Sequence, residues 1–376
     1  MNVLIAIDSF KGSMTSLEAG EACARGVRRA VPSALVRVLP MADGGEGTAA
    51  SLTAALGGET VRVTVSDPYG APVQASYGWI PAEGLAVMEM AAAAGITLSE
   101  RREPALASTR GVGQMIAHAL SRGCRKIMLG IGGSATNDGG IGMLSALGWR
   151  FLDENGGLCG DDGAALARVA SIDASHALPE LVSTSFQVAC DVRSPLCGPT
   201  GSTKVFGPQK GVRPEELDAV DAAMGSYAAA TAAACGRDES RTPGAGAAGG
   251  LGFALISWFN ARLCPGAAMV MDALGMDAAI AAADVVVTGE GRLDAQTSFG
   301  KVPAAVAARA ARCGKPVIAL AGSVSPDAGI CNDHGITAFF PILSGPVSLA
   351  QAMETETARA NMARTAEQAF RLLTVR

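Results

Sequence analysis

Short, uninterrupted apolar runs are the feature of this sequence that most constrains its fold. Met1–Asp8 reads MNVLIAID, and comparable runs occur at Asp284–Thr288, Pro316–Ala321 and Thr337–Pro341. A run that is apolar at consecutive positions suits a strand covered on both faces, as in the parallel sheet of an α/β protein. Because each run is far shorter than the roughly 18 apolar residues of a membrane span, the sequence predicts an α/β fold with no membrane segment.

A helix is predicted directly after the first run. Thr15 and Glu18 have the Thr-x-x-Glu spacing of a capping box, which indicates a helix from Thr15 to about Ala30. Pro32 ends that helix, and Leu35–Leu39 follows as a second strand. This strand–helix–strand order is typical of a βαβ unit.

The middle of the chain begins with a different pattern. Strand candidates at Glu59–Ser66, Val73–Ile80 and Leu85–Met90 are separated only by turn signals, which indicates an antiparallel meander. Alternating elements then resume, and the further predictions are strands at Lys126–Ile131 and Ser185–Cys190 and helices at Glu215–Ala234, Pro303–Arg312 and Ser348–Leu373. The simplest organisation is a parallel-sheet lobe formed by residues 1–65 and 284–376, with a second α/β lobe, carrying a mixed sheet, inserted over residues 66–283.

Composition excludes several classes of protein. Thirty Lys and Arg against 35 Asp and Glu give a net charge of −5, and only 4% of the 376 residues are aromatic, so a nucleic-acid partner is not expected. Nine cysteines without a Cys-x-x-Cys pair and three dispersed histidines argue against a zinc cluster. Asp8 and Lys11 leave too short an apolar run for a signal peptide, so we expect a cytoplasmic protein with reduced thiols. The sequence does not indicate an oligomeric state.

Glycine is concentrated in loops that also carry charged residues. The chain has 47 glycines, and many lie just beyond predicted strands, where ligands bind in open α/β sheets. Glycine there lets backbone N–H groups approach an anion, while the accompanying carboxylates suit Mg²⁺ and the lysines suit phosphate. This mixture points to phosphoryl transfer, with Lys11 on a phosphate at a helix N-terminus, although the chain has no Walker A motif.

Two glycine patterns match the dinucleotide-binding fingerprint without its full context. Gly244-x-Gly246-x-x-Gly249 follows a polar, turn-like stretch rather than a strand. Gly130-x-Gly132-x-x-Ala135 does follow a predicted strand, and Asp153 lies in the range of a ribose-binding acid. Asn137–Gly140 nevertheless interrupts the position of the required helix, so we expect a long loop and a helix beginning near Gly140. An NAD(P)-dependent hydroxy-acid reductase is therefore the alternative function, and a non-catalytic solute-binding protein is a third.

Five blocks of the sequence together resemble a known family. They are Asp8–Ser13 (DSFKGS), Met41–Thr48 (MADGGEGT), Gly130–Gly140 (GIGGSATNDGG), Cys190–Gly211 (CDVRSPLCGPTGSTKVFGPQKG) and Thr288–Pro303 (TGEGRLDAQTSFGKVP). In their order along the chain they resemble the bacterial glycerate kinase family that forms 2-phosphoglycerate. The resemblance implies ATP-dependent phosphorylation of D-glycerate at its 2-hydroxyl group with Mg²⁺. It also implies a flavodoxin-like first lobe, an inserted second lobe and a cleft between them.

The expected roles follow from what such a reaction needs. The proton acceptor would be Asp191, because it ends a buried strand before a glycine-rich loop, with Asp43 as second choice. Lys11 would stabilise the transferring phosphate, with Lys301 second. Mg²⁺ would be held by Asp138, Glu290 and Asp294, directly or through water. The other candidates for substrate or phosphate binding are Ser9, Gly132, Gly133, Ser134, Asn137, Lys210 and Ser298. The sequence does not decide which loops take ATP and which take glycerate.

Overall fold

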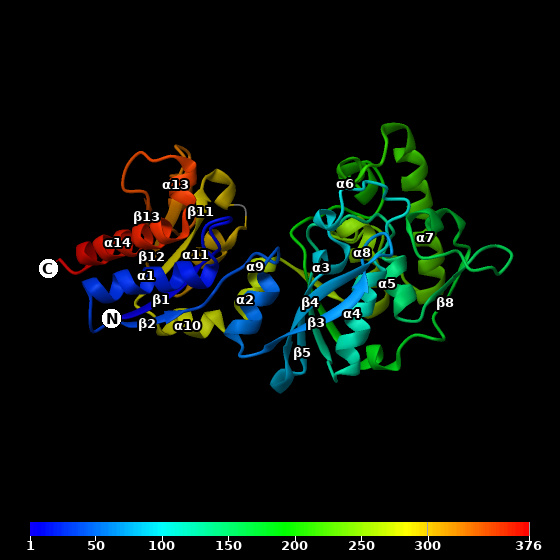
Figure 1. The fold of residues 1–376 in the computed structure, drawn as a ribbon, viewed down its shortest axis with the longest axis horizontal. Helices are drawn as coiled ribbons and strands as arrows, with labels where there is room; N and C mark the ends of the chain where they lie inside the picture. The colour runs from blue at the N-terminus through cyan, green and yellow to red at the C-terminus, as the bar shows by residue number, and fades with distance from the viewer. Residues whose placement is uncertain (299, 376) are drawn as a thin grey trace. The chain divides into compact units, whose positions relative to one another are not determined.

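The chain forms two compact units, each with its own sheet. The computed structural model describes residues 1–298 and 300–375 (Figure 1). Unit 1 comprises Met1–Asp43 and Ala267–Arg376, and unit 2 comprises Gly44–Gly266. Across the described residues, no helix has both the length and the apolar character that crossing a membrane requires.

Unit 1 is built on a five-stranded sheet in the order β13-β12-β11-β1-β2, and every neighbouring pair is parallel. Its strands are β1 (Asn2–Ile7), β2 (Leu35–Val38), β11 (Val285–Leu293), β12 (Val317–Val324) and β13 (Ala338–Pro341). Numbered along this sheet, the order is 2-1-3-4-5, which is the doubly wound order of flavodoxin-like folds. The predicted parallel-sheet fold is confirmed. Three of the apolar runs form the central strands β1, β11 and β12, whereas Thr337–Pro341 forms the partly buried edge strand β13.

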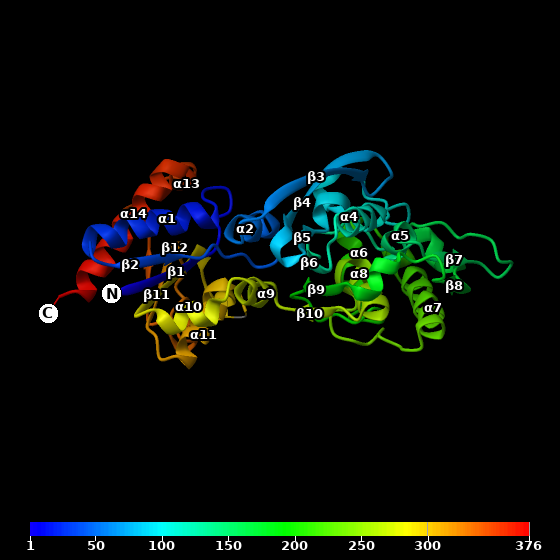
Figure 2. The ribbon, with the colours of Figure 1, turned by 90° about the horizontal axis from the view of Figure 1, so that it is seen from below.

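Helices cover both faces of this sheet. They are α1 (Ser16–Ala30), α9 (Gly266–Ala273), α10 (Met276–Ala282), α11 (Val302–Arg312), α12 (Ile330–Asp333), α13 (Leu349–Met353) and α14 (Thr355–Leu373). The predicted capping box is present, since Thr15 Oγ1 accepts from the Glu18 N–H and the Glu18 carboxylate accepts from the Thr15 N–H. Helices α1 and α14 lie side by side (Figures 1 and 2), and a Cβ at Gly26 would clash with the Ala363 carbonyl. Glycine at this position therefore allows the two helices to approach closely.

The single C-terminal helix expected over Ser348–Leu373 is two helices. The chain leaves helical geometry at Glu354, where φ is −60° and ψ is 124°, so α13 ends at Met353 and α14 begins at Thr355. Ser348 caps α13 through a second capping box with Gln351. The sequence from Ser348 to Leu373 contains no Gly or Pro, so it carries no helix breaker that would have revealed this break.

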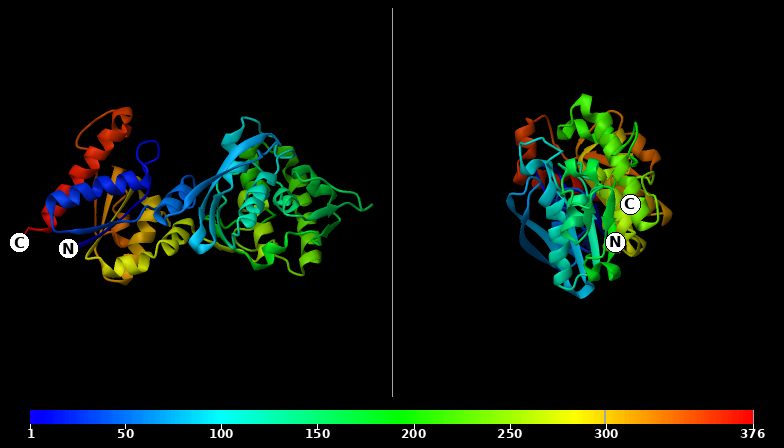
Figure 3. Two further views of the ribbon diagram at one scale, coloured as in Figure 1. Left: turned by 60° about the horizontal axis from the view of Figure 1, so that its bottom comes forward. Right: turned by 90° about the vertical axis from the view of Figure 1, so that its right-hand side faces the viewer.

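Unit 2 is built on a six-stranded mixed sheet in the order β10-β9-β6-β5-β4-β3 (Figure 3). Its strands are β3 (Glu59–Ser66), β4 (Pro72–Ile80), β5 (Leu85–Glu89), β6 (Lys126–Gly130), β9 (Ser185–Ala189) and β10 (Arg262–Cys264). Strands β3, β4 and β5 pair antiparallel, which confirms the predicted meander, and β5, β6, β9 and β10 are parallel. A separate antiparallel pair joins β7 (Arg150–Leu152) to β8 (Ser171–Asp173).

The helices of unit 2 pack on its sheet and enclose an aromatic core. They are α2 (Thr48–Ala55), α3 (Ala91–Ala94), α4 (Arg110–Ser121), α5 (Ile141–Ala146), α6 (Ser202–Lys210), α7 (Leu217–Cys235) and α8 (Ala247–Phe259). The ring of Trp149 packs edge-on against Trp258 and Phe259, and Phe259 stacks on Phe186 of β9. This cluster fixes α8 against the sheet and against the turn before β7.

The boundaries between the two compact units lie at residues 43/44 and 266/267, whereas the expected lobe boundaries lie at 65/66 and 283/284. Strand β3, which we had placed with the first lobe, pairs along its length with β4 and therefore belongs to unit 2. Helix α10, expected in the inserted lobe, lies in unit 1 and packs against β1 and α11. Both differences arise because membership of a unit depends on pairing and packing partners that are distant in the sequence.

All nine cysteines lie in the described part of the chain, and none is in a disulfide. Cys23, Cys124, Cys159 and Cys331 are buried, whereas Cys313 is exposed. The expectation of reduced thiols is thus consistent with the fold, but burial is not uniform.

Candidate functional site

The carboxyl ends of β1 and β11 carry acidic residues at the point where the strand order of unit 1 reverses. From β1, the chain crosses to β2 on one side of the sheet, and β11 lies on the other side. Asp8 follows β1, and its N–H donates to the Gly289 carbonyl at 2.9 Å. Glu290 is on β11, next to that carbonyl. In open α/β sheets this reversal is the usual place for a ligand.

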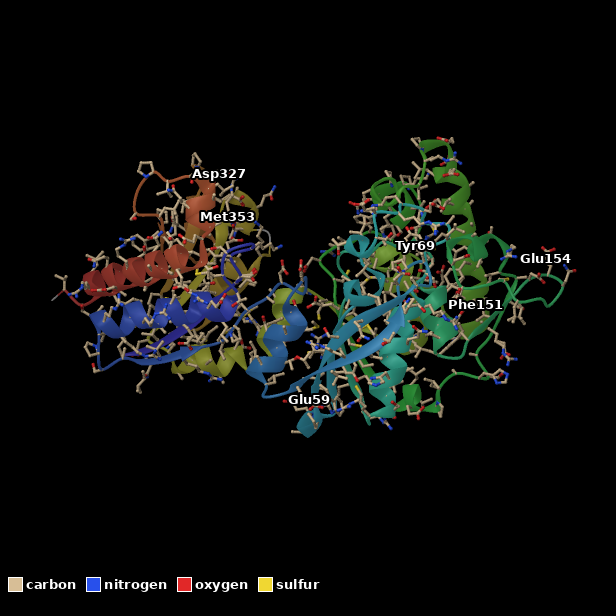
Figure 4. All side chains as sticks on the ribbon, in the orientation of Figure 1. Glu59, Tyr69, Phe151, Glu154, Asp327 and Met353 are labelled. Atoms are coloured by element: carbon tan, nitrogen blue, oxygen red, sulfur yellow. The ribbon has the colours of Figure 1, made fainter. Side chains whose placement is uncertain are left out.

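A pocket of about 460 Å³ opens at this position in unit 1. Its walls include Phe10, Ile342, Leu349 and Met353, and Figure 4 labels Met353 at the end of α13. Its charged and polar lining residues are Asp8, Ser9, Lys11, Ser13, Asp43, Glu290, Arg292, Lys301 and Ser323. The pocket thus gathers Ser9, Lys11, Asp43, Glu290 and Lys301, which were all predicted as site residues from separate loops.

Asp8 has the most strongly perturbed carboxyl group of this pocket. Burial, together with the negative charges of Asp43 and Glu290, raises the pKa of Asp8 to about 7, although the Ser9 N–H and Lys11 act in the opposite direction. The Ser9 N–H donates to Asp8 Oδ1 at 2.7 Å, which fixes the carboxyl orientation. A carboxyl group tuned to neutral pH in a pocket is suited to proton transfer. Sequence reasoning quoted Asp8 in a motif but did not select it as a site residue. The available signal was its place at the end of the first apolar run.

Glu290 and Asp294 share one lysine. Lys301 Nζ lies 3.7 Å from Glu290 Oε2 and 3.7 Å from Asp294 Oδ1. Thr297 Oγ1 donates to Glu290 Oε1 at 2.5 Å, and burial raises the pKa of Glu290. Asp294 Oδ1 is buried and, among the described residues, has no hydrogen-bond donor.

Glu290 and Asp294 fit Mg²⁺ as a partial set of ligands, which is the arrangement that kinases commonly use. Mg²⁺ is usually bound through one or two carboxylates, with phosphate oxygens and water completing its coordination. Glu290 and the unsatisfied Asp294 Oδ1 provide such a pair. Within residues 1–298 and 300–375, no group of three or more His, Cys, Asp or Glu side chains is arranged to hold a metal on its own.

The remaining candidate of this loop is Ser298. Its hydroxyl oxygen lies 3.7 Å from Cys331 Sγ, so it contacts a buried thiol of α12. Ser298 is not among the residues that line the pocket. Phe299, which belongs to the same predicted anion-binding stretch, lies outside the described residues.

In unit 2, the loop after β6 joins several predicted residues around a buried lysine. Gly132 and Gly133 are exposed, whereas Ser134, Asn137 and Lys210 are buried. Lys210 Nζ donates to Ser134 Oγ at 2.7 Å and to the Thr136 carbonyl at 2.6 Å. Burial lowers the pKa of Lys210 to about 7, with the charge of Asp138 opposing this shift. Lys210 is only 3% exposed. Its ammonium group therefore supports the loop from the protein interior and does not face a ligand.

Asp138 is engaged by its own backbone surroundings. Its Oδ2 accepts from the Thr109 N–H and hydroxyl, each at 2.7 Å, and from the Gly142 N–H at 3.2 Å. Its Oδ1 accepts from the Gly140 N–H at 3.1 Å. Asp138 is completely buried and lies in unit 2, whereas Glu290 and Asp294 lie in unit 1. The structure therefore gives Asp138 a structural task, joining the start of α4 to the start of α5, and both of its carboxylate oxygens already have protein donors.

A left-handed turn at the start of α8 supports the same loop. Ala248, Gly249 and Gly250 have φ values of 53°, 71° and 90°. The Gly249 carbonyl accepts from the Gly139 N–H at 2.9 Å, and a Cβ at Gly249 would clash with the Thr136 carbonyl. The glycine pattern that mimics a dinucleotide fingerprint here thus serves close backbone packing. Because α5 begins at Ile141, the expected long loop after β6 is confirmed as well.

Two carboxylates lie near the carboxyl ends of strands in unit 2. Asp191 follows β9, and its Oδ1 accepts from the Gly266 N–H at 3.1 Å. Glu89 ends β5, and its carboxylate accepts from the Ala49 N–H at 2.8 Å and from the Gly47 N–H at 3.4 Å, at the start of α2. Burial raises the pKa of Glu89. Sequence reasoning missed Glu89, because its partners lie about forty residues earlier in the chain.

The doubly wound sheet and the pocket of mixed charge at its reversal point define the class of this protein, an α/β enzyme with the groups that phosphoryl transfer uses. The model of the glycerate kinase family matches residues 3–374. The chain is 46% identical to a glycerate kinase of Bacillus subtilis over 94% of this chain and 93% of that one. It is 42% identical to a glycerate 2-kinase of Escherichia coli over the same shares of the two chains.

A solved structure agrees with these sequence comparisons. A crystal structure described as glycerate kinase 2 from Salmonella typhimurium LT2 superposes with a TM-score of 0.91 at 42% identity, covering 99% of this chain and 98% of that one. The chain therefore belongs to the glycerate kinase family and is a kinase. Its family membership supports glycerate as the compound that it phosphorylates. The resemblance inferred from the five sequence blocks is confirmed.

Proposed function

We propose that this enzyme transfers the γ-phosphoryl group of ATP to the 2-hydroxyl of D-glycerate, giving 2-phospho-D-glycerate and ADP. The observation that carries this proposal is the pocket of unit 1, in which Lys11 and Lys301 accompany Asp8, Asp43 and Glu290 at the reversal point of the sheet. Lysines neutralise charge on the transferring group, and a carboxylate accepts the proton of the attacking hydroxyl.

Lys11 is the proposed group for the transferring phosphoryl. It precedes α1 on a loop with Gly12, and its side chain is exposed beside the pocket rather than paired with a carboxylate within 4 Å among the described residues. Lys301, by contrast, already lies between Glu290 and Asp294. The charge of Lys11 is therefore less compensated by carboxylates than that of Lys301, and it is more available to a phosphate.

The proton acceptor is proposed from three carboxylates. Asp191 and Asp43 are the choices from sequence, and the geometry of the pocket adds Asp8. Asp8 lies in the same pocket as Lys11 and Asp43, and its pKa is raised to about 7. In the proposed step, the 2-hydroxyl oxygen forms its bond to phosphorus while the bond to the bridging oxygen of ADP breaks, and the hydroxyl proton passes to the carboxylate.

Mg²⁺ is proposed as the cofactor, held by Glu290 and Asp294 together with phosphate oxygens. When bound, it would neutralise charge on the phosphates of ATP. Lys301 keeps both carboxylates oriented toward one position, since it lies 3.7 Å from each. A cytoplasmic location remains a prediction from the sequence.

The test is product formation by the purified protein from D-glycerate, ATP and Mg²⁺, followed by phosphorus NMR. We expect a 2-phosphoglycerate signal that disappears when EDTA is added. A 3-phosphoglycerate signal would refute the proposed regiochemistry while leaving a glycerate kinase. The alternative of an NAD(P)-dependent reductase is not favoured, because no helix starts directly after Gly130–Ala135, where a dinucleotide fingerprint needs one.

A further inference from the structure

Unit 2 holds a cavity of about 720 Å³ whose walls are mainly small apolar side chains. Three stretches of chain form it, namely residues 102–106, the 3₁₀ helix Gly163–Arg168 and the stretch from Gly211 to Ala223. The apolar residues in its lining include Ala105, Leu106, Ala164, Ala167, Val220 and Ala223. The side chain of Leu106 lines the cavity and is 46% exposed.

The walls of the cavity are fixed by the backbone. A Cβ at Gly163 would clash with the Pro104 carbonyl, and one at Gly211 would clash with the Arg102 carbonyl, so neighbouring stretches touch through their main chains. The Ala164 N–H also donates to the Ala105 carbonyl at 2.8 Å. A site whose walls are built in this way does not have to reorganise to accept a ligand.

Tyr69, which Figure 4 labels, holds the first of these stretches in place. Its hydroxyl donates to the Arg101 carbonyl at 2.9 Å and accepts from the Glu103 N–H at 3.2 Å. The Arg101 guanidinium lies 4.6 Å from the centre of the Tyr69 ring and bonds to both oxygens of Glu103. Glu103 is thereby neutralised at the edge of the cavity.

Arg102 supplies a positive charge at the same edge. Its guanidinium donates to the carbonyls of Ser99 and Arg101 at 2.5 and 2.8 Å. Among the described residues, no carboxylate lies within 4 Å of it, whereas the cavity's other arginine, Arg213, is paired with Glu216. An apolar cavity with one uncompensated guanidinium suits a ligand that has an apolar, flat part and an anionic part.

The cavity reaches Asn137 on the loop after β6. Asn137 is 2% exposed, its Nδ2 donates to Thr203 Oγ1 at 3.1 Å, and its buried Oδ1 has no donor among the described residues. An unsatisfied buried acceptor favours a ligand that carries N–H groups. Asn137 follows Thr136, whose carbonyl accepts from Lys210, so this end of the cavity adjoins the glycine loop.

The size and lining of the cavity exclude glycerate as its occupant. Glycerate is a three-carbon acid with a carboxylate and two hydroxyls, and it would leave most of this space empty. Cavities of about 300–1,000 Å³ usually bind ligands that are several times larger than glycerate. A purine base with its ribose has the required size, apolar faces, and an edge with N–H groups.

We propose that the cavity lined by residues 102–106, 163–167 and 211–223 binds the adenosine part of ATP. The apolar side chains would contact the faces of the base, and Arg102 would lie toward the phosphate-bearing end. This inference rests on the proposed ATP-dependent function, and it assigns the nucleoside to unit 2.

The experiment compares two tryptophan substitutions one residue apart on α7. Ala223 lines the cavity, whereas its neighbour Ala222 is exposed and does not. We expect Ala223→Trp to weaken ADP binding, measured by calorimetry on the full chain without glycerate, by at least about tenfold, because the indole fills the space. Ala222→Trp should stay within about twofold of the wild type. Equal ADP affinity of Ala223→Trp and wild type would overturn the proposal.

Photolabelling keeps the test decisive if Ala223→Trp does not fold. The wild-type chain is irradiated with an azido-substituted ADP and the modified peptides are identified by mass spectrometry. Label within residues 102–106, 163–167 or 211–223 supports the site, and label confined to other stretches refutes it. ADP binding at this site without formation of phosphoglycerate would leave the inference standing and remove the proposed function. Phosphoglycerate formation with label confined to other stretches would refute the inference and leave the proposed function standing.

Discussion

The two pockets of this protein differ in what lines them. The pocket of unit 1 brings Asp8, Lys11, Asp43, Glu290, Arg292 and Lys301 together in about 460 Å³. The cavity of unit 2 is larger, about 720 Å³, and half of the residues that line it are alanine, valine or leucine. Proton and phosphoryl transfer need charged groups placed close together, because each group changes the electrostatic potential at the others. Recognition of a base instead needs apolar contact area and few charges. We therefore propose that the chemistry takes place in unit 1 and that unit 2 recognises the nucleoside.

The strongest test of this division is Asp8→Asn. Removing the proton acceptor should lower kcat by about 10²- to 10⁴-fold, the usual contribution of general-base catalysis, with little change in ADP affinity. Steady-state kinetics and ADP calorimetry on the same preparation measure both quantities. Asp191→Asn is the matched comparison in unit 2. Near-normal turnover by Asp8→Asn together with an inactive Asp191→Asn would transfer the proton acceptor to unit 2 and break the division.

Lys11→Met tests the cationic side of the same pocket. We expect kcat to fall by at least about 100-fold, because the lysine would stabilise charge that develops in the transition state. Lys315→Met is the control, since Lys315 precedes β12 at the amino edge of the same sheet. A loss of less than threefold for Lys11→Met would reject its role.

The pH dependence of the rate sharpens the assignment of Asp8. A base must be deprotonated to act, and the pKa of Asp8 is raised to about 7, so activity should be lost as the pH falls below about 7. We expect kcat/KM to fall about tenfold per pH unit in that range. The profile of Asp8→Asn should lack this limb. An unchanged profile in that variant would show that another group titrates.

The smallest expected effect concerns Lys210 and stability rather than activity. Its pKa is about 7 in the folded chain and near 10.5 when unfolded, so the unfolded chain binds more protons between these values. The free energy of unfolding should therefore rise with pH from about 7 to 9, by about 1.4 kcal/mol per pH unit at most. Lys210→Met should remove this component of the slope, measured by denaturant unfolding at several pH values. Lys204→Met, on the same helix with its Asp218 ion pair at the surface, should retain it. Equal slopes in the wild type and Lys210→Met would contradict this.

Local patterns predicted much of the fold. The apolar runs gave β1, β11 and β12, the Thr15–Glu18 spacing gave the start of α1, and turn signals gave the meander over 59–89. Each of these depends on neighbours in the sequence or on burial that the composition of the run itself requires. The unit boundaries differed because the partners of β3 and α10 are set by distant residues.

The site was less predictable than the fold for the same reason. Ser9, Lys11, Asp43, Glu290 and Lys301 line one pocket, because the strands that precede or carry them belong to one sheet and meet at one edge. Their roles at this site stay predictions. Lys210 and Asp138 looked like ligand-binding residues, but tertiary burial engages both with the backbone. No local pattern distinguishes a lysine that faces phosphate from one buried beneath a loop.

The order of strands in unit 1 also bears on how the chain folds as it is synthesised. Strand β1 lies between β2 and β11, and its register partner for Val3 is Val285, so its sheet requires residues from both ends of the chain. Unit 2 is continuous in sequence and is complete before β11 leaves the ribosome. Within the first forty residues only the β1–β2 pair can form, so the other edge of β1 stays unpaired until β11 has been translated. During that interval, the apolar segment Met1–Ile7 lacks one of its two neighbouring strands and is prone to aggregation.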